Sequence, residues 1–318
     1  MKDFYTYDQQ INKLKENGLI IENEAKVLEI LKLEGYYNII NGYSCMFKGN
    51  NEKYLKNTTF ENIVSLYNFD RNLQPIIYKY ALKIECHIKA LIAHEFSKNH
   101  GVDEKKYLSK DCFTKNANNI QQVEDLIKVC KKVINEGIDQ KNIRYRKYIE
   151  HNYIKHGHVP LWILIRALTF GTTSIFYKNM NSKEKQELAN YYLLTEDELG
   201  NMLEMLVQYR NIVAHGERIF CVKLNRVRLT DQLLVMKKMS VPYNKSGNAL
   251  YGRNDLLALL IIFKYLLPES EFIGFLYEII NEVGILEKNI DPIVIGKIKK
   301  DTGLCIGSWK VLHKINKI

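Results

Sequence analysis

Apolar residues recur at intervals of three and four along most of the chain, which is the period of an amphipathic α-helix. Residues 35–44, 100–120 and 156–160 read as loops, and residues 219–230 fit either a short hairpin or an extended segment. The pattern therefore predicts an all-α fold. Helices are expected over residues 8–18, 22–34, 58–97, 119–136, 139–155, 160–170, 174–180, 182–192, 195–215, 252–267, 271–283, 291–300 and 308–316.

Local signals refine these boundaries. Thr58 with Glu61, and Thr195 with Glu198, have the spacing of a capping box, in which a threonine and an acidic residue three positions later satisfy each other's backbone donors. Pro75 should kink the helix over 58–97 because it removes an intrahelical hydrogen bond. We expect two regions: residues 1–225 form the main helical domain, and residues 226–318 form a C-terminal helical region packed on it.

Composition excludes several classes of protein. Hydrophobic residues make up 46% of the 318 positions, too many for a disordered chain. The longest apolar run is Leu256 to Phe263, and a membrane span needs about 17 residues or more, so no membrane association is expected. The polar N-terminus does not resemble a signal peptide. Six scattered cysteines without a CxxC pair suggest a reduced cytoplasm. Trp162 and Trp309 are expected in the core.

The chain is basic, with 46 Lys and Arg against 36 Asp and Glu and a net charge of +10. This excess suggests a polyanionic partner, although a Lys-, Ile- and Asn-rich composition also arises in low-GC genomes without any such partner. Seven of the nine arginines fall within residues 144–228. Since arginine binds phosphate with two parallel hydrogen bonds, a phosphate-binding region is expected there. His151, His156 and His158 lack the spacing of metal ligands and fit a basic loop better.

The helix over 195–215 carries the strongest chemical signal. Arg210 lies within its apolar stripe, so it needs either a buried carboxylate or an opening onto a cleft or subunit interface. Asn211 and His215 share the adjoining edge, and Gly216 is placed to end the helix, where the dipole favours a protonated imidazole. These are the groups that RNA cleavage requires: an acid/base for the 2′- and 5′-oxygens, and a cation for the phosphorane.

Several ordered segments resemble the abortive-infection (Abi) proteins of the AbiD/AbiF type, within the HEPN ribonuclease superfamily. The resemblance covers most of the chain. Its segments are Gly35–Tyr37 with Gly42–Tyr43, Leu66–Arg71 with Ile84–Glu85, Pro160–Trp162 with Phe170–Ser174, Tyr209–His215 with Arg218, and a tail from Asp255 to Trp309.

The resemblance implies a HEPN-like helical bundle with additional N- and C-terminal helices. It further implies a metal-independent endoribonuclease toxin of phage defence, with no cofactor. By the resemblance His215 is the acid/base, Arg210 stabilises the phosphate and Asn211 orients the site. Such enzymes usually form homodimers with one composite site. AbiF-type members pair with a small structured noncoding RNA that acts as antitoxin or partner, and a bound RNA would also be compatible with a monomer.

Other charged residues leave alternatives open. Asp70 and Arg71 fit either a buried ion pair or support for the active site. Basic residues interleaved with aromatics suit RNA binding as well as a solvated helix face. The RNA-binding set is Arg144, Arg146, Lys147, Arg218, Lys223, Arg226 and Arg228. The alternative function is a non-catalytic RNA-binding or scaffold protein that retains the HEPN fold. A DNA-binding repressor is less favoured because no helix-turn-helix with a polar recognition helix is evident.

Overall fold

The computed structural model describes residues 4–114 and 119–315, and within them it has helices and no β-strand, which confirms the all-α prediction. Short π- and 3₁₀-segments cover Tyr37–Asn41, Ser44–Phe47, Lys110–Cys112 and Gly307–Lys314. The α-helices are α1 (Tyr7–Glu16), α2 (Glu24–Glu34), α3 (Phe60–His100), α4 (Glu104–Tyr107), α5 (Ile120–Ile138), α6 (Lys147–His156), α7 (Leu161–Ala167), α8 (Phe170–Asn179), α9 (Ser182–Asn190), α10 (Glu196–Ala214), α11 (Leu234–Lys238), α12 (Leu256–Leu266), α13 (Glu269–Asn289) and α14 (Pro292–Thr302).

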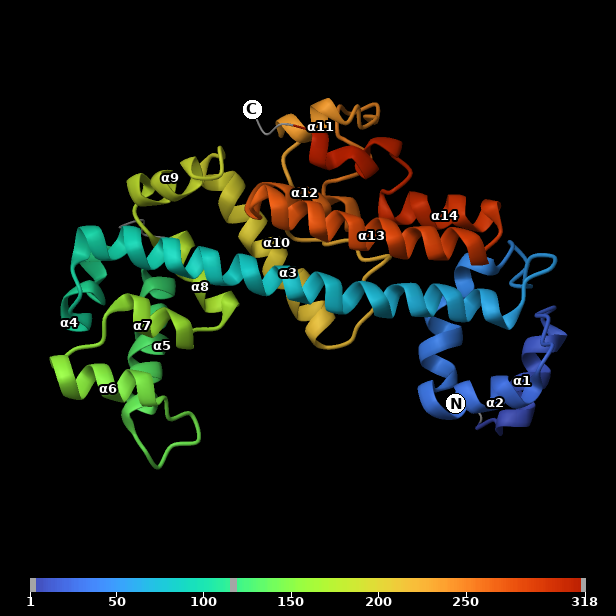
Figure 1. The fold of residues 1–318 in the computed structure, drawn as a ribbon, viewed down its shortest axis with the longest axis horizontal. Coiled ribbons are helices and arrows are strands. Elements are labelled where there is room, and N and C mark those ends of the chain that lie inside the picture. The colour runs from blue at the N-terminus through green and yellow to red at the C-terminus, as the bar shows by residue number, and fades with distance from the viewer. Residues whose placement is uncertain (1–3, 115–118, 316–318) are drawn as a thin grey trace.

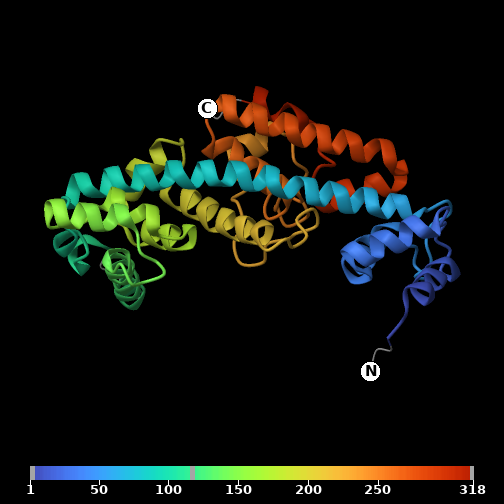
Figure 2. The same ribbon diagram turned by 60° about the horizontal axis from the view of Figure 1, so that its bottom comes forward.

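Helix α3 is the axis of an elongated molecule. Its 41 residues run along most of the length of the fold, with α1 and α2 near its first turns and α4 to α9 gathered around its C-terminal half (Figure 1). Helix α13 packs along one side of α3 and α10 along another (Figure 2). Because α10 ends against the middle of α3, the residues at its C-terminus meet side chains from one rigid helix.

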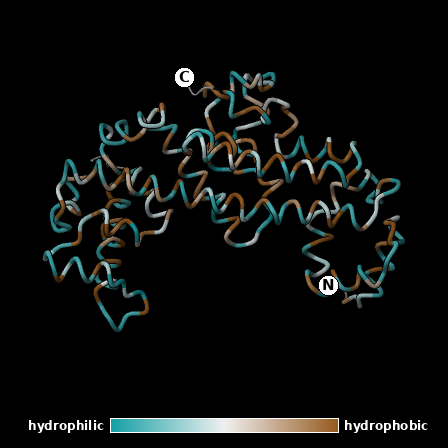
Figure 3. The backbone as a smooth tube through the Cα atoms, viewed as in Figure 1, coloured by the Kyte–Doolittle hydropathy of each residue, from teal (hydrophilic) through white to brown (hydrophobic). Residues whose placement is uncertain are grey.

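One continuous hydrophobic core includes residues from both predicted regions. Every residue of α12 is buried, which explains the unbroken apolar run in the sequence, and its brown trace lies inside the fold in Figure 3. The apolar stripe of α10 packs against α3 and α12. The single cation of α12, Lys264, is buried with its ammonium 2.9 Å from the Glu269 carboxylate. None of the described helices is long and apolar enough to cross a membrane.

The start of α3 differs from the prediction. Thr59 rather than Thr58 caps the helix, and it forms a capping box with Asn62. Thr58 is buried, and its carbonyl accepts a hydrogen bond from the Ile20 amide, which keeps it in extended backbone. The helix continues through Pro75, which lies on the exposed side of α3. The Arg71 carbonyl that Pro75 leaves without a helical donor is thus near solvent, which lowers the cost of the proline.

Two further helix boundaries and the burial of one tryptophan differ from the prediction. The helix expected over 139–155 begins only at Lys147, because asparagine and aspartate side chains bond nearby amides in residues 139–146 and compete with helix formation. The helix expected over 160–170 ends at Ala167, and the helix expected from 174 begins already at Phe170, because Thr169 accepts the Thr172 amide and caps α8. Trp309 is buried as expected, but Trp162 is 47% exposed.

Candidate active site and nucleic-acid interface

The capping box of α10 forms as predicted, with Thr195 and Glu198 satisfying each other's amides. The helix ends at Ala214, His215 is its cap residue, and Gly216 adopts φ +67°, in the left-handed region that favours glycine. The side chains of Asn211 and His215 are exposed, and their four-residue spacing places them on one side of the helix. A carboxamide and an imidazole therefore face solvent together at this helix end.

Arg210 points from α10 toward α3. Its Nη2 lies 4.0 Å from Oε2 of Glu85, and its guanidinium carbon lies 5.7 Å from the centre of the Tyr78 ring. Its Nη1 donates to the Asn211 side-chain oxygen at 3.3 Å. The side chain is 27% exposed. The structure thus provides both of the solutions that the sequence left open, a buried carboxylate and an opening to solvent.

Glu85 is a site residue that sequence reasoning noted only as part of a family segment. It is 8% exposed, and its Oε1 accepts a hydrogen bond from Lys89 at 2.7 Å. Lys89 also donates to the Leu168 carbonyl at 2.7 Å. Oε2 of Glu85 and Nε of Arg210 are buried without a hydrogen-bond partner in the described part of the chain. The available signal was an acidic residue on the buried face of α3, four positions before a lysine.

The segment that follows His215 is held by another part of α3. Arg71 Nη1 donates to the Gly216 carbonyl at 2.8 Å, and Gln74 donates to the Glu217 carbonyl at 3.1 Å. Asp70 is fully buried and accepts the backbone amides of Ile219 and Phe220 at 3.0 and 2.7 Å. Asp70 and Arg71 therefore hold this segment rather than form an ion pair with each other.

A tyrosine completes this anchor. The Tyr43 hydroxyl donates to Asp70 Oδ2 at 2.8 Å. Burial raises the pKa of Asp70, although the amides of Phe220 and Ile219 and the Tyr43 hydroxyl oppose that shift. Arg218, predicted to bind RNA, donates to the Gly42 carbonyl and lies 6.0 Å from the Tyr43 ring centre. The structure therefore uses Arg218 to fasten the loop after His215.

These residues lie within the part of the chain that known proteins resemble. Residues 29–221 match the family of Abi-like proteins. The chain belongs to the Abi-like family. Membership suggests a role in abortive infection, the defence of bacteria against phage. No curated protein and no solved structure matches the chain. The matched region of this Abi-like protein includes α3 and α10, and therefore both anchors of the helix end.

Two of the predicted RNA-binding residues lie beside the exposed face of α10. Lys223 and Arg226 line a cavity of about 630 Å³ together with Gln208 and Ile212. Helical spacing places this face of α10 on the same side as His215. Lys223 also lies 3.5 Å from the Asp255 carboxylate, and Arg228 is exposed two residues beyond Arg226.

A second predicted group lies before and at the start of α6. Arg144 and Arg146 line a cavity of about 360 Å³ whose wall includes Thr169 and Thr172. Arg144 pairs with Glu136 at 3.3 Å, and Lys147, the first residue of α6, is exposed. Ser174 borders the cavity beside α10, so the first turns of α8 lie between the two basic groups. Basic segments about 80 residues apart in sequence therefore flank the start of α8.

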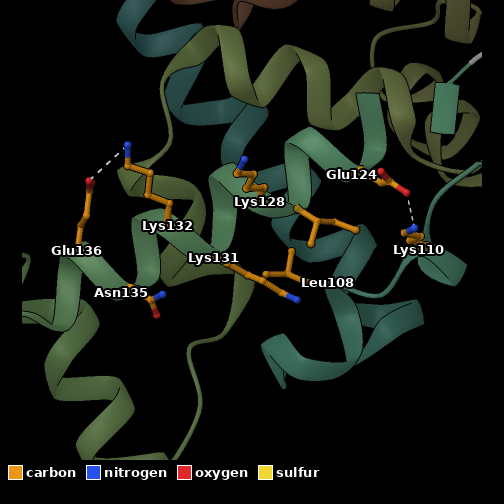
Figure 4. Close-up of a pocket in the computed structure, with 9 residues that line it drawn as sticks. Leu108, Lys110, Glu124, Lys128, Lys131, Lys132, Asn135 and Glu136 are labelled. Carbon is orange, nitrogen blue, oxygen red and sulfur yellow. Dashed lines mark hydrogen bonds and ion pairs between the residues drawn. The ribbon is translucent and has the colours of Figure 1, made fainter. Parts of the chain in front are cut away.

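A third basic surface of this Abi-like protein escaped sequence reasoning. Lys128, Lys131 and Lys132 project from α5 around a hollow of about 670 Å³, which Lys110 also borders (Figure 4). Lys132 approaches Glu136 at 3.8 Å, and Lys110 pairs with Glu124. The lysine spacing of three and four in this helix was the signal. In the part of the chain that the structure describes, no three His, Cys, Asp or Glu residues gather as metal ligands would.

Proposed function

We propose that this Abi-like protein is a metal-independent endoribonuclease toxin of the HEPN type. The observation that carries the proposal is the end of α10. There Asn211 and His215 are exposed, while Arg210 is held beside them by Glu85 of α3. The combination of a titratable group and a phosphate-binding cation at one solvent-facing helix end suits phosphoryl transfer, and basic cavities on both sides of α8 suit a polyanionic substrate.

The chemistry follows from these groups. His215 as base removes the proton of a 2′-hydroxyl, whose oxygen then forms a bond to the neighbouring phosphorus. An imidazolium donates a proton to the leaving 5′-oxygen as the phosphorus–oxygen bond breaks. Arg210 stabilises the negative charge of the pentavalent phosphorane, and Asn211 positions that guanidinium through its side-chain oxygen. The products are a 2′,3′-cyclic phosphate and a free 5′-hydroxyl.

His215 is the one histidine that each chain places at the end of α10, and a single imidazole cannot be base and acid at the same moment. The proposal therefore includes a homodimer with a composite site. The apolar stripe around Arg210 does not supply the dimer surface, because α3 and α12 of the same chain cover it. The exposed edge of α10 with Asn211 and His215 is the surface that a second copy would face. A structured noncoding RNA bound along the basic cavities would restrain the toxin by covering this edge.

The alternative is a non-catalytic RNA-binding protein on the same fold. What favours it is the partial burial of Arg210, only 27% exposed and already beside a carboxylate. The two proposals differ in what His215 does, because RNA binding alone does not need an imidazole at the helix end.

The deciding experiment compares growth and RNA cleavage for wild type, His215→Ala and His313→Ala. His313 lies near the C-terminus and serves as the matched histidine control. We expect growth arrest and EDTA-resistant cleavage, with 2′,3′-cyclic phosphate ends, for wild type and His313→Ala only. Toxicity of folded His215→Ala equal to wild type would refute the nuclease. Activity lost in EDTA and restored by magnesium would refute the metal-independent mechanism.

A further inference from the structure

Beside the Arg210–Glu85 pair lies a hollow of about 730 Å³ between α3 and α7. Its walls include Glu85 and Lys89 from α3, and Trp162 and Arg166 from α7. A volume of this size is typical of small-ligand pockets. Glu85 lines this hollow and its Oε2 lies 4.0 Å from Nη2 of Arg210, so one residue links the hollow to the group proposed to bind the scissile phosphate.

Trp162 is the feature that requires an explanation. Its side chain is 47% exposed, whereas Trp309, the other tryptophan, is 1% exposed. An indole is the largest apolar ring available, and leaving half of it in water forfeits much of its burial free energy. Trp162 lines the hollow together with Arg166 of the same helix.

We propose that this hollow binds an unpaired nucleobase of the RNA, stacked on Trp162. The inference rests on the proposed function, because it assigns a subsite next to the same reactive phosphate. Bases stack on aromatic rings with little regard to sequence, and cations beside the ring hold the flanking phosphates. Arg166 is exposed and is the cation available for a phosphate at the hollow, because Lys89 is already paired with Glu85 at 2.7 Å.

The hollow is also connected to the predicted phosphate-binding residues. Arg166 lies with its guanidinium carbon 5.7 Å from the ring centre of Tyr148, at the start of α6. Lys89 holds the Leu168 carbonyl, and Leu168 itself lines the cavity that contains Arg144 and Arg146. An RNA strand that leaves the hollow along α7 therefore reaches Arg144 and Arg146, in the basic segment before α6.

A second copy of the chain is the competing occupant. A two-fold interface centred on Trp162 would bring Arg166 of each copy toward Arg166 of the other. That repulsion, together with the concave shape, favours a polyanion over a second copy at this face.

The test uses the emission of Trp162, which dominates the response to added ligand because Trp309 is buried. The probes are a short single-stranded RNA and a ribose-phosphate strand of equal length without bases, added to His215→Ala protein so that no cleavage occurs. We expect quenching by the RNA and none by the abasic strand. Stacking is worth about 1–3 kcal/mol per base, so Trp162→Ala should weaken RNA binding roughly 5- to 150-fold, measured by fluorescence anisotropy of labelled RNA.

Controls separate the possible failures. Trp162→Phe keeps a ring and should retain most of the affinity, and Tyr277→Ala, which removes a ring 59% exposed on α13, should change nothing. RNA binding without quenching, equal affinity in Trp162→Ala, or no RNA binding at all would overturn the subsite. The subsite would also be overturned if the Trp162 emission changed with protein concentration and not with added RNA, which would indicate that a second copy covers the hollow. Cleavage by wild type with an unchanged KM in Trp162→Ala would reject the subsite and leave the nuclease standing. Quenching by RNA in His215→Ala protein, together with no RNA cleavage by wild type, would reject the nuclease and leave the subsite standing.

Discussion

Replacing Asp70 tests how the segment after His215 is held. The Asp70 carboxylate accepts two backbone amides and the Tyr43 hydroxyl in a fully buried site. Asp70→Ala leaves these three donors without an acceptor. Each buried donor left unsatisfied costs about 1–3 kcal/mol. Partial relaxation reduces the sum, so we expect a loss of about 3–5 kcal/mol in the free energy of unfolding. That is a large share of the roughly 5–15 kcal/mol of a typical domain.

Asp70→Asn separates hydrogen bonding from charge. The amide oxygen still accepts both backbone amides, and the new NH₂ group donates to the Tyr43 oxygen, whose hydroxyl reverses its role. Burial raises the pKa of Asp70, so the ionised form is held at a desolvation cost that asparagine does not carry. We therefore expect Asp70→Asn to cost less than about 1.5 kcal/mol.

Urea denaturation followed by far-UV circular dichroism measures both changes, and Asp301→Ala on the exposed side of α14 is the control, expected within about 0.5 kcal/mol of wild type. An alanine variant as stable as the control would refute the hydrogen-bond argument. Equal losses for alanine and asparagine would show that the charge, not the acceptor geometry, holds the segment.

Three more predictions concern binding, assembly and pH. Changing Arg144, Arg146 and Lys147 together to alanine should weaken RNA binding and reduce the salt-dependence slope by up to about 2, at roughly 0.7 per phosphate contact; an unchanged slope would mean that these residues are merely solvated. Mixed dimers of wild type and His215→Ala should have much less than half of the wild-type activity, whereas a fully active monomer by light scattering would contradict the composite site. Burial raises the pKa of Glu278, but hydrogen bonds from a lysine and a tyrosine of α3 outweigh it and lower the pKa overall. The ionised Glu278 carboxylate therefore stabilises the fold above about pH 4.3, the ordinary pKa of glutamate, and this stabilisation is lost as the pH falls through the lower folded-state pKa. Glu278→Gln should flatten the pH dependence of the free energy of unfolding between about pH 5 and 3.

The sequence was informative where local rules determine the structure. The helical period gave the all-α class, and the capping box at Thr195 located the start of α10 because both of its partners are within one turn. The need for a partner at Arg210 also followed from the sequence, since a charge in an apolar stripe must be compensated. Rules of this kind depend on neighbours along the chain.

Long-range contacts account for what the sequence did not show. Glu85 meets Arg210 across 125 positions, and no local signal specifies that α3 and α10 cross at that point. The hydrogen bond from Arg218 to the Gly42 carbonyl joins residues 176 positions apart, and RNA binding by this exposed arginine stays a prediction. The exposure of Trp162 likewise depends on where α7 meets α3.

Helix α3 contacts the end of α10 at two separate points, and α13 packs along α3 between them. Asp70, Arg71 and Gln74 fix the backbone beyond His215, and fifteen residues further along, about 22 Å on an ideal helix, Glu85 fixes Arg210. Pro75 lies between these two contact points. There α3 lacks one of its backbone hydrogen bonds and would bend most easily.

Helix α13 spans this weak point. It accepts hydrogen bonds from Asn72 on one side of Pro75 and from Lys79 on the other. Helix α13 lies beyond residue 221, where the match to the Abi-like family ends. Helix α13 therefore braces α3 between its contact with Arg210 and its contacts with the segment after His215, and a change in the length or attachment of α13 would alter the distance between those two contacts.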